Sequence, residues 1–151
     1  MDKCRIAIYD CYVPLNDEVK KLHIDKLEDM KKEIGQYPEY RIVAEFSDEC
    51  SATTPLLERP GYQKVMWLVD TCKVDMIVSI SMKNFSRNLE DTLSALQTFK
   101  DKGVTLKCPS DNFDSGHIEM VEDLNFIKNY GMEFDDEIEE EQEPDGGMVM
   151  Q

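Results

Sequence analysis

Short apolar runs alternate along this chain with longer segments in which apolar residues recur at helical spacing. The apolar runs are rich in β-branched and aromatic residues and predict buried strands at residues 4–9, 40–46, 74–81 and 104–108. The other segments predict helices at residues 16–34, 61–72 and 88–102, and Gly35 and Gly103 are placed to end two of them. This alternation predicts an α/β fold, in which helices cover both faces of a mostly parallel sheet of four to five strands.

The periodicity weakens after residue 114, and the last part of the chain is strongly acidic. Residues 118–130 are compatible with one more short helix. Residues 133–145 then hold nine of the 32 acidic residues and no basic one. We therefore predict one folded domain over residues 1–130 and an acidic, disordered tail over residues 131–151.

The net charge of −15 restricts the partners that the protein can bind. Binding to duplex DNA needs clustered Lys and Arg that neutralise phosphates, whereas this chain has 17 basic residues against 32 acidic ones. We expect contact with DNA to be weak or to be made through a partner protein.

Five cysteines are present, without a CxxC pair or a Cys/His spacing typical of zinc ligands. Reduced thiols are therefore expected, with no disulfide framework, no metal site and no cofactor. The longest apolar run, residues 65–69, is far shorter than a membrane span, and the N-terminus lacks the apolar stretch of a signal peptide. We predict a soluble, cytoplasmic protein that does not contact membranes.

Four blocks of sequence carry a resemblance to a known family. The first is RIAIY (5–9); the second combines AEFSDE (44–49) with ERPGYQ (58–63); the third runs from KVDMIVSI (73–80) into FSRNLED (85–91); the fourth joins GVTL (103–106) to FDS (113–115). Over about residues 4–115 these blocks resemble, in order and spacing, the N-terminal catalytic domain of the serine recombinases of the resolvase/invertase family. The resemblance implies a three-layer α/β sandwich. It also implies DNA strand exchange through a phosphoserine intermediate, with arginines that neutralise the phosphate.

The catalytic residues of that family are only partly present. In the family the nucleophile closes a Tyr-x-Arg-x-Ser motif after the first strand; here Tyr9 matches, but Cys11 replaces the arginine and Val13 the serine. A second arginine position, in the third block, is occupied by Asn84. The resemblance therefore leaves no catalytic nucleophile. The family-site residues that remain are Tyr9, Asp48, Arg59, Ser86 and Arg87.

This pattern favours an inactive relative of the recombinases that acts through protein contacts. Its partner would be a second copy or an intact serine recombinase. Two alternatives stay open. Strand exchange or phosphodiester cleavage could persist with Tyr12, Ser47 or Ser51 as the nucleophile, or the α/β scaffold could serve as a small regulatory binding domain.

Three further expectations follow from the resemblance. Full members continue into a long dimerising helix and a DNA-binding domain, whose patterns are absent here, so a truncated member is predicted. Cys11 is interpreted as a buried, unreactive thiol, because no histidine lies near it in sequence. Arg59 and Arg87 are expected to be structural residues that pair with acids such as Asp48; a residual phosphate site is the alternative.

Overall fold

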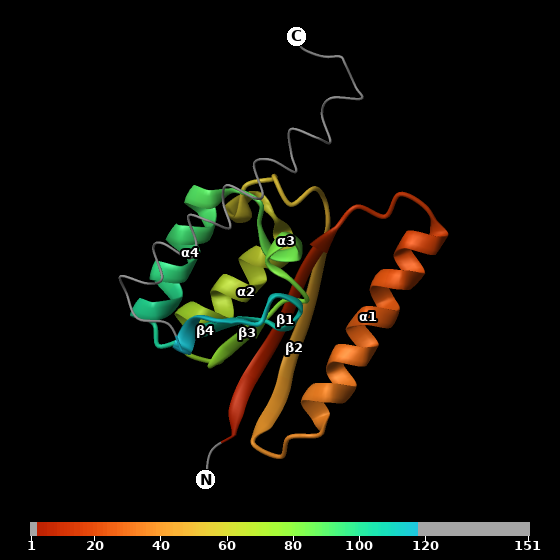
Figure 1. Ribbon diagram of the computed structural model, residues 1–151. Coiled ribbons are helices and arrows are strands. Elements are labelled where there is room, and N and C mark those ends of the chain that lie inside the picture. Colours follow the sequence, from red (N-terminus) through yellow and green to blue (C-terminus); the bar gives the residue numbers. More distant parts are fainter. Residues whose placement is uncertain (1–2, 118–151) are drawn as a thin grey trace.

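A five-stranded sheet forms the centre of the structure, a computed structural model that describes residues 3–117 (Figure 1). Its strands are β1 (Cys4–Tyr12), β2 (Tyr40–Glu49), β3 (Met76–Val78), β4 (Thr105–Cys108) and β5 (Phe113–Asp114). In the spatial order β2-β1-β3-β4-β5 the first four strands are parallel, and β5 is antiparallel to β4. The predicted α/β fold with a mostly parallel sheet is confirmed, and β5 lies where the sequence had indicated a loop.

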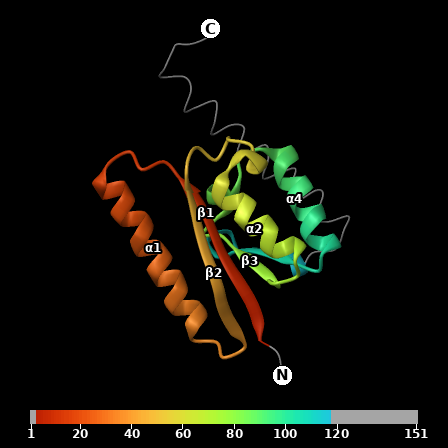
Figure 2. The same cartoon turned by 180° about the vertical axis from the view of Figure 1, so that it is seen from behind.

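Helices lie on both faces of the sheet. They are α1 (Asp17–Gly35), α2 (Pro60–Asp70), α3 (Met82–Phe85) and α4 (Leu89–Asp101), with short 3₁₀ turns at Leu56–Glu58, Pro109–Asp111 and Ser115–His117. Figure 1 and the view from behind in Figure 2 show α1 on one face and α2 and α4 on the other, which gives the expected three layers. The three long helices agree with prediction within two residues at each end, whereas α3 was expected to be loop.

The side chains of β1 alternate between two apolar cores. Tyr9 and Cys11 face α2 and α4 and belong to the larger core, which also contains Phe99 of α4. Ile8 faces α1 and packs in a smaller core with Leu27. A parallel strand in the middle of a sheet is buried on both faces, so β1 appears in the sequence as a nearly continuous apolar run.

β1 and β2 each extend three residues beyond their predicted ends. The parallel ladder continues there and pairs Cys11 with Asp48 and Tyr12 with Glu49. The predictions were too short because they followed the apolar pattern, whereas the backbone hydrogen bonds of a ladder do not depend on side-chain type. β3, by contrast, is confined to Met76–Val78 and is shorter than predicted.

Within residues 3–117, no helix is long and apolar enough to cross a bilayer. The helix predicted at residues 118–130 and the acidic tail predicted at residues 131–151 lie outside the described residues. All of the positions that the resemblance marks as catalytic lie inside them.

Candidate active site

The carboxyl ends of β1, β2 and β3 meet at one edge of the sheet, which is where parallel α/β sheets place their functional groups. Cys11 lies near the end of β1, Asp48 near the end of β2, and Asn84 in α3, which follows β3. Val13 lies in the loop after β1, with 44% of its surface exposed. The structure thus brings the predicted site positions together from three separate parts of the chain.

Arg59, the residue just before α2, is the centre of the site. It is 1% exposed, and its guanidinium donates to the carbonyls of Phe85 (2.6 Å), Ala52 (2.9 Å) and Thr54 (3.0 Å). Its Nη1 also lies 3.4 Å from the Tyr9 hydroxyl oxygen. Arg59 therefore joins β1, the loop before α2 and the end of α3, and it holds its charge inside the protein. We call Arg59, its three carbonyl acceptors, Tyr9 and Asp48 the Arg59 network.

Asp48 stabilises the beginning of α2 rather than pairing with Arg59. Its carboxylate accepts hydrogen bonds from the backbone amides of Gly61 (2.7 Å) and Tyr62 (3.0 Å) and from the Tyr9 hydroxyl (2.7 Å). A carboxylate at a helix N-terminus satisfies amides that have no partner within the helix and interacts favourably with the helix dipole. The predicted pairing of Arg59 with Asp48 is wrong: the Tyr9 hydroxyl stands between them. Burial raises the pKa of Tyr9, so its hydroxyl stays protonated and can donate to Asp48.

Gly61 allows this close approach of Asp48 to the helix. A Cβ atom at position 61 would lie 2.8 Å from one carboxylate oxygen of Asp48, closer than van der Waals contact permits. The glycine in the block ERPGYQ therefore has a packing function: it makes room for the carboxylate that caps α2.

Cys11 and Asn84, the positions at which the resemblance predicts arginines, are engaged in internal hydrogen bonds. Cys11 is 1% exposed, and its thiol donates to the carbonyl of Cys50 at 3.1 Å. Burial raises the pKa of Cys11 to about 12, so the thiol is protonated at neutral pH. The predicted burial of this cysteine is confirmed. The side-chain amide of Asn84 donates to the Cys11 carbonyl (3.2 Å) and accepts from the Ser81 hydroxyl (2.8 Å).

Ser86 and Arg87 form the turn that leads from α3 into α4. The Ser86 hydroxyl is fully buried and accepts from the backbone amide of Asn88 at 3.1 Å. The backbone amide of Arg87 donates to the Ala52 carbonyl (2.9 Å), which Arg59 also contacts. The two retained arginines therefore meet at one carbonyl group, Arg59 through its side chain and Arg87 through its backbone.

Asp10 is a buried acid that the family motif does not mark. It lies in β1 on the face opposite Tyr9, is fully buried, and accepts from the Ile80 amide at 2.9 Å through Oδ1. Its Oδ2 is buried and has no hydrogen-bond partner among the described residues. Burial raises the pKa of this carboxyl from 3.8 to about 7. A charged residue directly after the predicted apolar strand was the only signal in the sequence.

Asp10 should make the stability of the protein depend on pH. Its pKa is higher in the folded chain than in the unfolded one, so its favourable contribution is complete below about pH 4 and is lost as the pH rises towards 7. Relative to Asp10→Asn, the native chain should lose about 2–3 kcal/mol of unfolding free energy between pH 5 and pH 8 in urea denaturation.

Asp75→Asn is the matched control for Asp10. Arg5 lowers the pKa of Asp75, so Asp75 is already ionised throughout this pH range. The difference in unfolding free energy between Asp75→Asn and the native chain should therefore stay constant between pH 5 and pH 8. Equal pH profiles for the native chain and Asp10→Asn would contradict the prediction.

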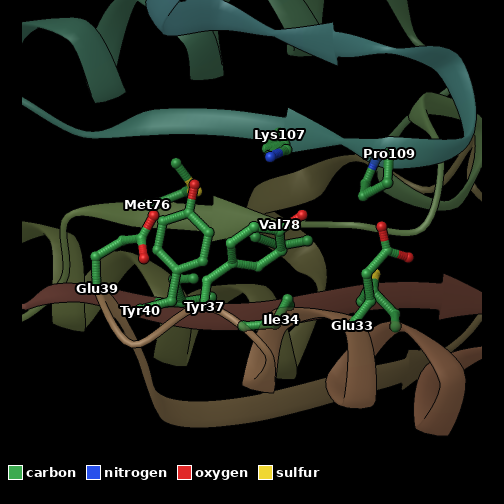
Figure 3. A pocket seen from close by; sticks show the side chains of 11 residues that line it. Glu33, Ile34, Tyr37, Glu39, Tyr40, Met76, Val78, Lys107 and Pro109 are labelled. Atoms are coloured by element: carbon green, nitrogen blue, oxygen red, sulfur yellow. The ribbon is translucent and has the colours of Figure 1, made fainter.

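A separate cavity of about 220 Å³ lies on the α1 face of the sheet, between the end of α1 and the strands β1, β3 and β4 (Figure 3). The rings of Tyr37 and Tyr40 line it with centroids 5.7 Å apart, and Lys107 Nζ lies 5.8 Å from the centre of the Tyr40 ring. The other lining residues are mostly apolar and are Ile6, Met30, Glu33, Ile34, Glu39, Met76, Val78 and Pro109. We call it the α1 cavity. It lies on the other face of the sheet from Tyr9 and Cys11.

Among the described residues no group of three or more His, Cys, Asp or Glu side chains is placed to hold a metal ion. The α/β fold, a mostly parallel five-stranded sheet with helices on both faces, is that of serine recombinase catalytic domains. The family of the resolvase N-terminal domain matches residues 17–141, and the chain belongs to that family. The matched part contains Asp48, Arg59, Ser86 and Arg87 and begins after Val13.

Solved structures support the same fold. A resolvase family site-specific recombinase from Streptococcus pneumoniae superposes with a TM-score of 0.66 at 21% identity, covering 92% of this chain and 93% of that one. The N-terminal catalytic domain of TP901-1 integrase superposes with a TM-score of 0.62 at 19% identity. The match covers 92% of this chain and 98% of that one. The C-terminal catalytic domain of ISC1926 TnpA, an IS607-like serine recombinase, superposes with a TM-score of 0.59 at 19% identity. The match covers 69% of this chain and 67% of that one. No curated protein matches this chain.

Proposed function

We propose that this resolvase-family domain does not cleave DNA and acts through contacts with another protein. The observation that carries the proposal is the engagement of the site residues inside the fold. Val13 has no nucleophilic atom, and the Cys11 thiol and Asn84 amide are hydrogen-bonded within the protein. The guanidinium of Arg59 is buried and donates to three backbone carbonyls, so it is not presented to a phosphate.

The alternative nucleophiles lack the surroundings that such chemistry needs. The Tyr12 hydroxyl lies 3.4 Å from a Glu49 carboxylate oxygen, and burial together with that carboxylate raises the pKa of Tyr12. The Ser51 hydroxyl is hydrogen-bonded to Thr53 at 2.8 Å. A nucleophile for phosphodiester cleavage needs positive charge around the phosphate, whereas Tyr12 contacts a carboxylate and Ser51 contacts a hydroxyl.

The native chain should form no covalent adduct with DNA. A nicked suicide duplex traps an active recombinase as a protein–DNA species that survives denaturing electrophoresis. Val13→Ser should also form none, because the two arginine positions at Cys11 and Asn84 stay neutral and each missing charge donor costs about two to three orders of magnitude in rate.

An active resolvase-family recombinase, assayed on its own site, is the positive control for trapping. The native chain is assayed on a pool of random duplexes that carry the same nick. A DNA-linked species from the native chain, abolished by Tyr12→Phe or by Ser51→Ala, would overturn the proposal and identify the nucleophile.

The α1 cavity supports the second half of the proposal, action through protein contacts. Its lining is apolar and aromatic, and Tyr37 is 46% exposed at its edge (Figure 3). Tyrosines beside apolar residues are typical of the central parts of protein interfaces. The net charge of −15 and the acidic residues 133–145 oppose a nucleic-acid partner.

Association can be tested by sedimentation velocity of the full chain, alone and mixed with an active resolvase-family recombinase. We expect a concentration-dependent heavier species that Tyr37→Ala weakens. Leu22→Ala removes a comparably exposed side chain of α1 (55%) and is the matched control. If the native chain sediments as a monomer both alone and in the mixture, the protein-contact proposal fails, whatever the result of the trapping assay.

A further inference from the structure

Two of the five cysteines lie next to each other at the carboxyl ends of neighbouring strands. Cys11 lies in β1, and Cys50 is the first residue after β2. The ladder pairs Cys11 with Asp48 and Tyr12 with Glu49, so Cys50 continues β2 directly beyond the last pair. The Cys11 thiol donates to the Cys50 carbonyl at 3.1 Å. Burial is the main cause that raises the pKa of Cys11, and the neighbouring Cys50 adds to it.

The two thiols differ in accessibility. Cys11 is buried, whereas Cys50 is only half-buried. The other three cysteines lie elsewhere: Cys4 at the beginning of β1, Cys72 after α2 and Cys108 at the end of β4. The fold therefore pairs one half-buried cysteine with one buried cysteine.

We propose that Cys11 and Cys50 are a redox modification site that closes to an intramolecular disulfide, with a small disulfide such as glutathione disulfide as the oxidant. The Cys50 thiolate attacks one sulfur of glutathione disulfide, whose S–S bond breaks and releases one glutathione thiolate. The Cys11 sulfur then attacks Cys50 in the mixed disulfide and releases the second glutathione thiolate. The two cysteine protons end on the two glutathione molecules, so two electrons pass from the cysteine pair to the oxidant.

The disulfide would act on the Arg59 network. The Cys11 carbonyl accepts from Asn84, and the loop that Cys50 begins supplies the Ala52 and Thr54 carbonyls to Arg59. A covalent bond between positions 11 and 50 fixes the start of that loop to β1. Oxidation should therefore restrict the loop and raise the melting temperature of the chain.

The burial of Cys11 predicts a characteristic rate law. The pKa of Cys11 is raised to about 12, so its thiolate fraction increases about tenfold for each pH unit between pH 7 and pH 9. The closing step should accelerate by about the same factor, and glutathione attached to Cys50 should accumulate at the lower pH. Cys108 is also buried with a raised pKa, but no cysteine is among the causes that raise it, so it should stay reduced.

The test is oxidation of the folded full chain with glutathione disulfide, followed by acid quenching and non-reducing peptide mapping by mass spectrometry. We expect a peptide pair linked through Cys11 and Cys50 and a melting temperature about 5 °C higher or more, both reversed by dithiothreitol. Cys72→Ser should retain both results, while Cys50→Ser and Cys11→Ser should lose both. Should Cys11→Ser fail to fold, the native map and Cys50→Ser decide the question.

Two results would overturn the proposal. One is glutathione bound to Cys72 alone, with Cys11 and Cys50 recovered as free thiols from the folded chain. The other is a Cys11–Cys50 disulfide that appears only after urea unfolds the protein, because the native contact would then have no part in its formation.

Discussion

Replacing Arg59 with methionine should lower the free energy of unfolding by about 3–5 kcal/mol, measured by urea denaturation. Methionine fills part of the space but donates no hydrogen bond. The carbonyls of Ala52, Thr54 and Phe85 would lose a charged donor in a buried position, where unsatisfied polar groups are costly. Arg59→Lys should also destabilise the protein, since one ammonium group cannot reach three carbonyls in the geometry of a guanidinium.

Arg41→Met is the matched control, because Arg41 is an exposed residue of β2 and should change stability by no more than about 0.5 kcal/mol. The same preparations test for a phosphate site. Since the Arg59 donors are used inside the protein, phosphate and sulfate should not raise the melting temperature of the native chain. A loss of less than about 1 kcal/mol in Arg59→Met, together with stabilisation by phosphate, would contradict the structural role.

Replacing Asp48 with alanine should lower the free energy of unfolding by about 3 kcal/mol, because it removes three hydrogen bonds at once. The amides of Gly61 and Tyr62 would lose their acceptor at the first turn of α2, and the buried Tyr9 hydroxyl would lose its own. Burial raises the pKa of Tyr9, so ionisation of the phenol at neutral pH would not relieve the loss. Urea denaturation followed by circular dichroism measures the change.

Glu49→Ala provides the comparison, since Glu49 follows Asp48 in β2 but is exposed and makes one long contact, 3.4 Å, with Tyr12. Glu49→Ala should lower the free energy of unfolding by less than about 1 kcal/mol. Asp48→Asn keeps one acceptor oxygen, so its loss of unfolding free energy should lie between the losses of Asp48→Ala and Glu49→Ala. Equal effects of Asp48→Ala and Glu49→Ala would show that the cap does not stabilise α2.

The order of the elements could be predicted because it depends on short-range patterns. Apolar runs with β-branched residues marked the parallel strands, and helical spacing ended by Gly35 and Gly103 marked α1 and α4. Gly103 has a φ of +73°, a conformation that glycine adopts without strain, so its position at the end of α4 could be predicted as well. β5 and α3 could not, because two to four residues are too few to show a period.

The site was predictable as a set of positions but not as a set of contacts. The resemblance marked Tyr9, Asp48 and Arg59 individually, and the sequence suggested an ion pair between the last two. In the structure their charges are separated by the Tyr9 hydroxyl, and Arg59 contacts backbone carbonyls up to 26 positions away in sequence. Every residue has a backbone carbonyl, so a sequence motif cannot show which carbonyls accept from Arg59.

The sequence by itself therefore determined the parallel α/β architecture, the presence of valine where the family resemblance predicts the nucleophile, and the acidic charge of the chain. Local patterns and residue identities are sufficient for these properties. Only the tertiary structure decided that Arg59 is buried, that Asp48 caps α2 and that Cys11 and Cys50 are neighbours. Each of these depends on the register in which β1, β2 and the following loops come together, and that register is set by long-range packing.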